Sequence, residues 1–297
     1  MSPSAPTPSA PNSSAHAPSA FPTFARTTGA LVRDTFREAM ARKIFWGLFG
    51  LSSAMILFFL FLLKIDIVEG AVASVSLFGG ESREMSVERI VQGFHGGIAA
   101  FLYTFGMFLA VFASSGLTPS LLEPGRIELL LSKPVSRPHL LLGRYLGNLL
   151  VVSANIVWLV MGVWLILGWK AGVWTPNFLV TMASTIFLFA VLLTVVFLIG
   201  VLWESAALAT MVPVALMIVS PILAQEKTMV KLLSSEWSRQ LWKALYAILP
   251  KVFDLGRMTM DHVRQRPVES WYPVWTSGLF GIGVLALAVW VFTRRDF

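Results

Sequence analysis

Long apolar runs alternate along the chain with shorter polar segments that contain nearly all of its charge. Six of these runs contain no Asp, Glu, Lys or Arg, and each has the length of roughly 20 residues that a helix needs to cross a bilayer. They cover residues 45–63, 93–115, 145–167, 178–202, 206–224 and 271–292. The pattern predicts an all-α membrane protein with about six transmembrane helices.

An amphipathic segment precedes the first run. Its apolar residues recur every four positions and therefore share one face of a helix: Val32, Phe36, Met40 and Ile44. Its basic residues come between them: Arg33, Arg37, Arg42 and Lys43. We expect an N-terminal interfacial helix that lies on an anionic membrane surface before the chain enters the bilayer.

A second amphipathic segment lies between the fifth and sixth runs. Trp237, Leu241, Leu245 and Ile248 mark one helical face, and Pro250 ends the pattern. We predict an outer amphipathic or re-entrant helix before the last span. The sequence equally allows a small helical cap on the outer surface that has no role in transport.

Residues 1–24 differ from the rest of the chain in composition. This stretch is rich in Pro, Ser and Ala and has no Asp, Glu, Lys or Arg, so it cannot bury a core and is expected to be disordered. It also lacks the basic and apolar regions of a signal peptide. We therefore predict a disordered tail at 1–24 and a single transmembrane domain over 25–297.

Composition agrees with a membrane location and excludes several classes of function. With 56% hydrophobic and 13% charged residues, a water-soluble fold is excluded. The net charge of +7 would suggest nucleic acid in a soluble protein. Here the basic residues flank apolar runs, which indicates membrane lipids and not nucleic acid. We expect Arg294 and Arg295 to lie at the membrane surface, as do the basic residues before the first span. The chain has no cysteine and its four histidines are dispersed, so we expect neither disulfides nor a metal site.

The distribution of Lys and Arg predicts the orientation. Basic residues are dense before the first span, between the second and third, and after the sixth at Arg294 and Arg295, whereas the first two loops on the other side contain few. Residues 225–270 complicate this contrast because they are also rich in Lys and Arg. Since the first helix usually dominates, we predict that both termini are cytoplasmic.

No predicted span has a charged residue in its interior. A charge at the bilayer centre costs about 2.5–3.5 kcal/mol on insertion scales and is usually kept for ion coupling, so an ion-coupled carrier is disfavoured. The chain also lacks the phosphate-binding loop GxxxxGK[ST], the GxSxG nucleophile motif and paired carboxylates. We therefore predict no enzyme activity on this chain, and energy for any transport must come from another chain.

The loop between the second and third spans is the most informative segment. Glu123, Pro124 and Gly125 interrupt the chain, an apolar turn with one acid follows at 127–131, and Lys133-Pro134 ends it. Four aliphatic side chains in such a turn are unfavourable in water unless something covers them. Either a partner protein or the membrane surface could cover these side chains.

The segment Glu123–Arg137 followed by Gly143-Arg-Tyr-Leu-Gly147 resembles the coupling loop of type-2 ABC exporter permeases. The similarity is greatest to the branch with the permeases of nitrous oxide reductase maturation and of gliding motility. The basic C-terminal ending is also similar. Where many relatives have Gly-Thr-Leu, this chain has Gly125-Arg126-Ile127, and Pro124 is a further departure.

The resemblance implies a dimeric permease in the bacterial cytoplasmic membrane. Each copy would bind a cytosolic ATP-binding cassette ATPase that holds ATP and Mg, with no cofactor on this chain. The implied ATPase-coupling residues are Glu123, Gly125, Arg126, Ile127, Glu128, Leu130, Leu131, Lys133, Pro134 and Arg137. The basic ones would pair with acidic residues of the ATPase or hold the loop against headgroups. The runner-up function is a membrane scaffold or assembly factor, and the sequence leaves the substrate open.

Overall fold

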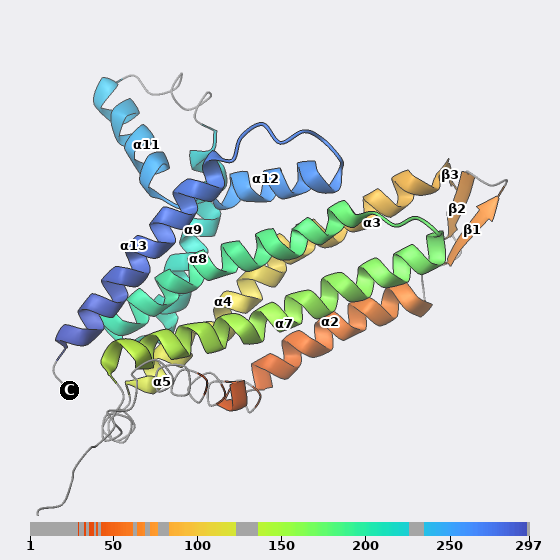
Figure 1. Cartoon of the computed structure of the whole chain (residues 1–297). Coiled ribbons are helices and arrows are strands. Elements are labelled where there is room, and N and C mark those ends of the chain that lie inside the picture. Colours follow the sequence, from red (N-terminus) through yellow and green to blue (C-terminus); the bar gives the residue numbers. More distant parts are fainter. Residues whose placement is uncertain are drawn as a thin grey trace, which may run out of the picture.

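The computed structural model describes residues 29, 33, 36–38, 40, 43–61, 64–68, 72–76, 83–122, 136–225 and 235–295 (Figure 1). The predicted tail at 1–24 lies outside them. Ahead of the third span the elements are α2 (Lys43–Phe61), β1 (Lys64–Val68), β2 (Val72–Ser76), β3 (Arg83–Ser86), α3 (Val87–Phe101), the π-helical turn η1 (Leu102–Gly106), α4 (Met107–Ser115) and α5 (Leu117–Leu121). The remaining elements are α7 (Arg137–Ala171), the 3₁₀ turn η2 (Pro176–Leu179), α8 (Val180–Trp203), α9 (Ala206–Leu223), α11 (Glu236–Ile248), α12 (Val252–Val263) and α13 (Tyr272–Arg294).

Every predicted span corresponds to an apolar helix. Five helical segments of the described chain are long and apolar enough to cross a membrane: Val87–Ser115, Arg137–Ala171, Pro176–Trp203, Ala206–Leu223 and Tyr272–Arg294. The segment for the first span is shorter, Phe45–Phe61. The helical fold class is confirmed, and the protein is a multi-pass membrane protein. In the N-terminal interfacial segment, all described residues are helical.

The third span is longer than predicted because its helix continues outside the bilayer-length apolar run. The predicted span begins at residue 145, whereas α7 begins at Arg137 and has 35 residues. Ser136 is extended and Pro138 lies in the first turn, where proline is accommodated because the first N–H groups have no helical partner. The extra turns place the residues that follow the coupling loop on a rigid helix.

The centre of the bundle is α8, which packs against α4, α7, α9, α12 and α13. Buried side chains point from it in all directions, among them Leu188, Phe189, Leu192, Val196 and Phe197. A helix that is apolar on all sides is stable only when protein or lipid surrounds it. These five neighbouring helices surround α8, so it is the core helix around which the other spans pack.

A small antiparallel sheet lies between the first two spans and was not predicted. Its order is β1-β2-β3, with Lys64 opposite Ser76 and Val72 opposite Ser86. The residues Lys64-Ile-Asp-Ile67 alternate polar and apolar types, which is the period of a strand. Figure 1 shows the sheet at one end of the bundle, beyond the end of α2 and the start of α3.

The predicted helix before the last span is present as α11, and it ends before Pro250 as expected. Its apolar face remains uncovered, with Trp237 72% and Ile248 65% exposed. The second helix of this segment, α12, was not predicted. It packs against α3, α8 and α9 and crosses the end of the bundle opposite the C terminus (Figure 1).

Lys251 joins α11, α12 and α13. Its Nζ donates to the carbonyl of Tyr246 at 3.0 Å and lies 4.5 and 4.7 Å from the ring centres of Tyr246 and Tyr272. Its backbone N–H donates to Ser277 Oγ at 3.0 Å. Burial lowers the pKa of Lys251 from its ordinary value, while the nearby Asp254 carboxylate opposes this shift. Two aromatic faces and a carbonyl compensate the buried charge, so the start of α12 is fixed in position.

Candidate functional site

A cavity of about 730 Å³ opens between three parts of the bundle: the α3–η1–α4 segment, α9 and α12. Around the cavity, α9 packs against α4, and α12 packs against both α3 and α9. The cavity walls are mostly apolar, with Phe105 and Phe108 on one side and Val214, Met217 and Ile218 on the other. Its size is within the range of roughly 300–1,000 Å³ that small-molecule sites have.

The π-helical turn η1 shapes one wall of this cavity. Such single π turns inside α-helices are frequent at functional sites. Tyr103 lies in this turn and lines the cavity, and its hydroxyl is buried with no hydrogen-bond partner among the described residues. Its ring approaches α12 so closely that a Cβ on Gly256 would lie 2.7 Å from it. Glycine at 256 therefore allows the ring to pack against α12.

Two prolines interrupt the opposite wall. Pro213 and Pro221 are inside α9, and Pro221 lacks the N–H that would bond the carbonyl of Met217. Met217 and Pro221 both line the cavity, so the interruption of the helical hydrogen bonds lies in this apolar wall. Ser220 ties this part of α9 to α12, because its Oγ accepts from the N–H of Phe253 at 2.9 Å.

Arginines surround the end of the cavity that α12 covers. An adjoining hollow of about 480 Å³ is lined by Arg89, Gln92, Arg264 and Arg266, and Arg257 lies on the cavity side. All four arginines are exposed, and within the described part of the chain their guanidinium groups form no ion pair or hydrogen bond. We call these four residues the arginine rim.

Backbone geometry at the end of α12 holds two residues of the rim in place. Gln265 has a left-handed φ of 56°. The N–H of Arg266 donates to the carbonyl of Asp261 at 2.7 Å, and the N–H of Gln265 donates to that of His262 at 3.0 Å. This pair of bonds is a Schellman motif, so Arg264 and Arg266 flank a fixed turn.

The opposite end of the bundle contains the two anchor points of the predicted coupling loop. The loop residues from Glu123 to Pro134 lie outside the described residues. On their N-terminal side, α5 packs against α4, α8 and α9. On their C-terminal side the chain resumes at Ser136 and enters α7. The loop is therefore attached to two different parts of the core.

Three arginines hold helix ends together here. Arg137 Nη1 donates to the carbonyls of Thr293 at 3.3 Å and Arg295 at 2.6 Å, at the end of α13. Arg295 in turn donates to the Val201 carbonyl and to the Glu204 carboxylate at the end of α8. Cations at helix C-termini are favourable because the last carbonyls carry partial negative charge.

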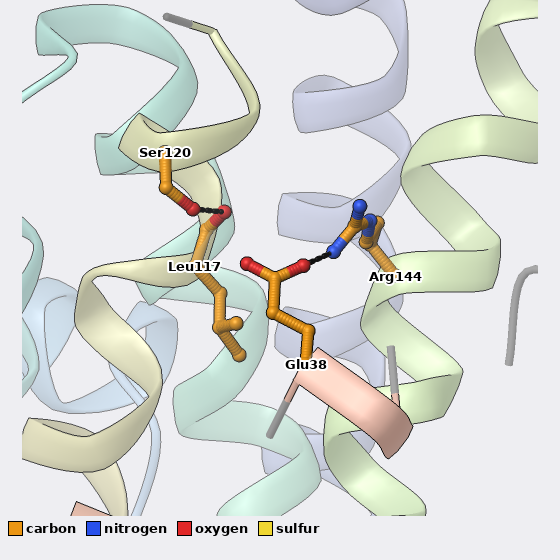
Figure 2. Close-up of polar contacts among 4 residues, drawn as sticks. All are labelled: Glu38, Leu117, Ser120 and Arg144. Atoms are coloured by element: carbon orange, nitrogen blue, oxygen red, sulfur yellow. Dashed lines mark hydrogen bonds and ion pairs between the residues drawn. The ribbon is translucent and has the colours of Figure 1, made fainter. Parts of the chain in front are cut away.

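The third is Arg144, which forms an ion pair with Glu38 of the N-terminal helical segment. Arg144 and Glu38 side chains are only 4% and 17% exposed. Figure 2 shows Glu38 between Arg144 of α7 and the Leu117–Ser120 turn of α5, where Ser120 Oγ donates to the Leu117 carbonyl at 3.0 Å. The pair thus attaches the N-terminal segment next to both anchor points of the loop.

Comparison with protein families decides the identity. A sequence model of ABC-2 family transporter proteins matches residues 30–297, which includes every transmembrane helix, the cavity and the loop. The chain belongs to the ABC-2 transporter family. A search of curated protein sequences finds no match. As an ABC-2 permease it is a membrane component that has no ATPase activity itself, and permeases of this family function with ABC ATPase partners.

The predicted site residues of this permease have different outcomes. Of the coupling residues, only Arg137 is described, and its guanidinium binds the end of α13. Among the predicted membrane-surface residues, Arg42 lies outside the described residues, while Arg33, Arg37 and Lys43 are exposed. Arg294 lies 4.6 Å from the centre of the Trp290 ring. Arg295 was predicted to face the membrane surface, and the structure pairs it with Glu204.

No pattern in the sequence indicated the cavity, the arginine rim or the Glu38–Arg144 pair. Arg144 belongs to the Gly143-Arg-Tyr-Leu-Gly147 segment, which was noted only as a family marker. Glu38 is one of two acids, with Asp34, in a basic amphipathic segment, and these exceptions were a usable signal that did not by itself distinguish Glu38. The rim residues are far apart in the chain, so no local pattern connects Arg89 with Arg264.

Proposed function

We propose that this ABC-2 permease exports its substrate as a dimer, with each copy bound through residues 123–135 to a cytosolic ABC ATPase that holds ATP and Mg. The observation that supports the proposal best is the attachment of the loop's two ends. One end continues from α5, and the other enters α7 beside the Arg137 and Arg144 contacts. A force on the loop would therefore move α7, α13 and the N-terminal segment as a rigid unit.

Within the loop, we propose that the ATPase binds the turn from Ile127 to Leu131, with Glu128 in its cleft. Glu123 and Gly125 before the turn, and Lys133 and Pro134 after it, would shape the loop. Arg126 and Lys133 would pair with acidic residues of the ATPase. Arg137 has a different role in this proposal, because its guanidinium is already engaged with α13: it positions the loop.

A second permease copy would complete the pathway. The cavity opens on the face formed by α4 and α9, where Phe105, Phe112, Met211 and Ile218 are each at least half exposed. Lipid can cover such side chains, but lipid alone would leave a cavity with a buried tyrosine hydroxyl open to hydrocarbon. A second copy placed on this face would enclose the cavity between two permeases.

Mass measurement of the purified complex tests this proposal. We expect the permease, expressed with its partner ABC ATPase, to purify as two permease chains and two ATPases, and ATP to be hydrolysed only with the ATPase present. Detergent mass is subtracted by light scattering with absorbance and refractive index. A single permease chain that never retains an ATPase would contradict the proposal and favour the scaffold function.

We further propose a location in the bacterial cytoplasmic membrane with both termini in the cytoplasm. Ser136 precedes α7 and Ser235 follows α9, so three proposed spans separate these two exposed positions, and the chain has no native cysteine. In intact cells, an impermeant maleimide should label Ser235→Cys and should label Ser136→Cys only after lysis. Labelling of both positions in intact cells would contradict this topology.

A further inference from the structure

The cavity and the arginine rim differ in chemistry but form one continuous space. The two hollows share Ala100, Met260, Arg264 and Arg266 as lining residues. One part is apolar and lies between the spans, and the other is basic and lies at the end of the bundle. A ligand that uses both parts must itself have an apolar part and an anionic part.

We propose that this site binds an anionic amphiphile, with its hydrocarbon chain in the cavity and its oxyanionic head at the arginine rim. Its assignment as the transported substrate rests on the export function proposed above, whereas its binding does not. Chain and head would be bound by separate groups of residues, so each contribution can be removed without the other.

The rim is suited to an oxyanion. Guanidinium groups present planar pairs of donors that match phosphate and carboxylate oxygens. Arg264 and Arg266 come from one fixed turn and Arg89 from the start of α3, so the rim approaches the mouth from two elements. On α3, within two to three turns of Arg89, a Cβ added at Gly93, Gly96 or Gly97 would meet no atom within 4 Å, which leaves room for a head group.

The charge balance argues against a cationic or neutral ligand. Across both hollows the lining includes the four arginines of the rim and a single carboxylate, Asp261. A cation would be repelled by this excess of positive charge. A neutral apolar compound would gain nothing from the rim, and a small soluble anion would leave the apolar cavity unused.

The apolar part is suited to a flexible chain. Phenylalanines on η1 and α4 face aliphatic side chains and methionine on α9, and Met217 can adapt its shape to an irregular ligand. The interior has few polar groups, chiefly the hydroxyls of Tyr103, Thr104 and Thr259. The last of these donates to the Leu255 carbonyl of its own helix. These groups are too few to hold a sugar or a peptide, whose many polar groups would each need a partner.

Saturation binding of radiolabelled dodecyl phosphate tests the proposal. The permease is reconstituted in phosphatidylcholine nanodiscs, and empty nanodiscs give the lipid background. We expect saturable binding by the wild-type protein. Unlabelled dodecylphosphocholine, which has the same chain and a zwitterionic head, should compete at least about tenfold more weakly, because one charge-assisted hydrogen bond is worth about that factor. Inorganic phosphate, which has no chain, should not compete.

Two variants separate the head from the chain. Arg264→Gln/Arg266→Gln removes rim charge at exposed positions and should weaken binding about tenfold or more. Thr104→Phe leaves the rim unchanged but fills the cavity from an exposed position of η1 that does not line the arginine-lined hollow, and it should weaken binding by a similar factor. Lys243→Gln on α11 removes one exposed charge away from the cavity and should leave the affinity unchanged. Elution volumes on size exclusion establish that each variant is folded.

Several outcomes would overturn the proposal. They are unchanged affinity in both variants, equal competition by dodecylphosphocholine, and full competition by inorganic phosphate. In the complex with the ATPase, dodecyl phosphate should stimulate ATP hydrolysis by the wild type and not by Arg264→Gln/Arg266→Gln. Binding without stimulation would reject the ligand as a substrate but keep the site, and loss of the ATPase alone would contradict only the export function.

Discussion

Leu130→Asp is expected to abolish binding of the ATPase while the permease still inserts and folds. An exposed turn of aliphatic residues is stable only where a partner or the membrane covers it, and we propose that the ATPase covers this turn. A carboxylate forced into that interface without a partner must either lose its hydration or break the contact. Retention of the ATPase on tagged permease, measured by pull-down, reports the result.

Milder changes at the same turn should give graded effects. Burying an aliphatic side chain contributes about 1.5–3 kcal/mol, so Leu130→Ala should weaken ATPase binding about tenfold to a hundredfold. Glu128→Ala should reduce the coupling of ATP hydrolysis to transport. Ser235→Asp is the matched control, because it adds the same charge at an exposed position at the other end of the bundle.

The loop assignment fails if Leu130→Asp keeps both its ATPase and full transport in vesicles. Equal loss of ATPase in Leu130→Asp and in the Ser235→Asp control would indicate a general effect of charge. In either case the binding site for an anionic amphiphile would remain to be judged by its own measurements.

Breaking the Glu38–Arg144 pair should destabilise the permease by about 3 kcal/mol, the lower end of the range for buried ion pairs. We choose the lower end because the Glu38 side chain keeps 17% of its exposure. For a protein of this size the midpoint of thermal unfolding should fall by about 5–10 °C. Both Glu38→Gln and Arg144→Met should show the effect, and both should loosen the attachment of the N-terminal segment to α7.

A double-mutant cycle identifies the interaction itself. Glu38→Gln/Arg144→Met removes both charges, so it should cost less than the sum of the single changes, with a coupling energy of about 1 kcal/mol or more. Arg37→Ala is the control, because Arg37 is exposed on the same helical segment, and it should leave the midpoint unchanged. Additivity of the two single changes within about 0.5 kcal/mol would show that the pair makes no specific contribution.

The sequence alone determined the positions of the membrane-spanning helices. It also predicted that the energy for transport comes from another chain. Residues that face lipid or a lipid-like core must be apolar along a length set by the bilayer, so a charge-free run of about 20 residues has one main outcome. The end of α11 before Pro250 was predictable for a similar reason, because proline acts on its own helix. The absence of a phosphate-binding loop or a nucleophile motif could also be judged from the sequence, because each of these motifs is a short local pattern.

Only the tertiary structure decided which helix is central, how the small sheet forms, and where the site lies. The run at 178–202 has the highest mean hydropathy of the five long spans, but hydropathy does not tell a helix surrounded by lipid from one surrounded by protein, and packing makes α8 the core. The cavity lies between the α3–η1–α4 segment, α9 and α12, and the rim combines Arg89 with residues about 170 positions later. Such juxtapositions depend on contacts between distant segments, because local periodicity reports which face of a helix is apolar but not which helix will cover it.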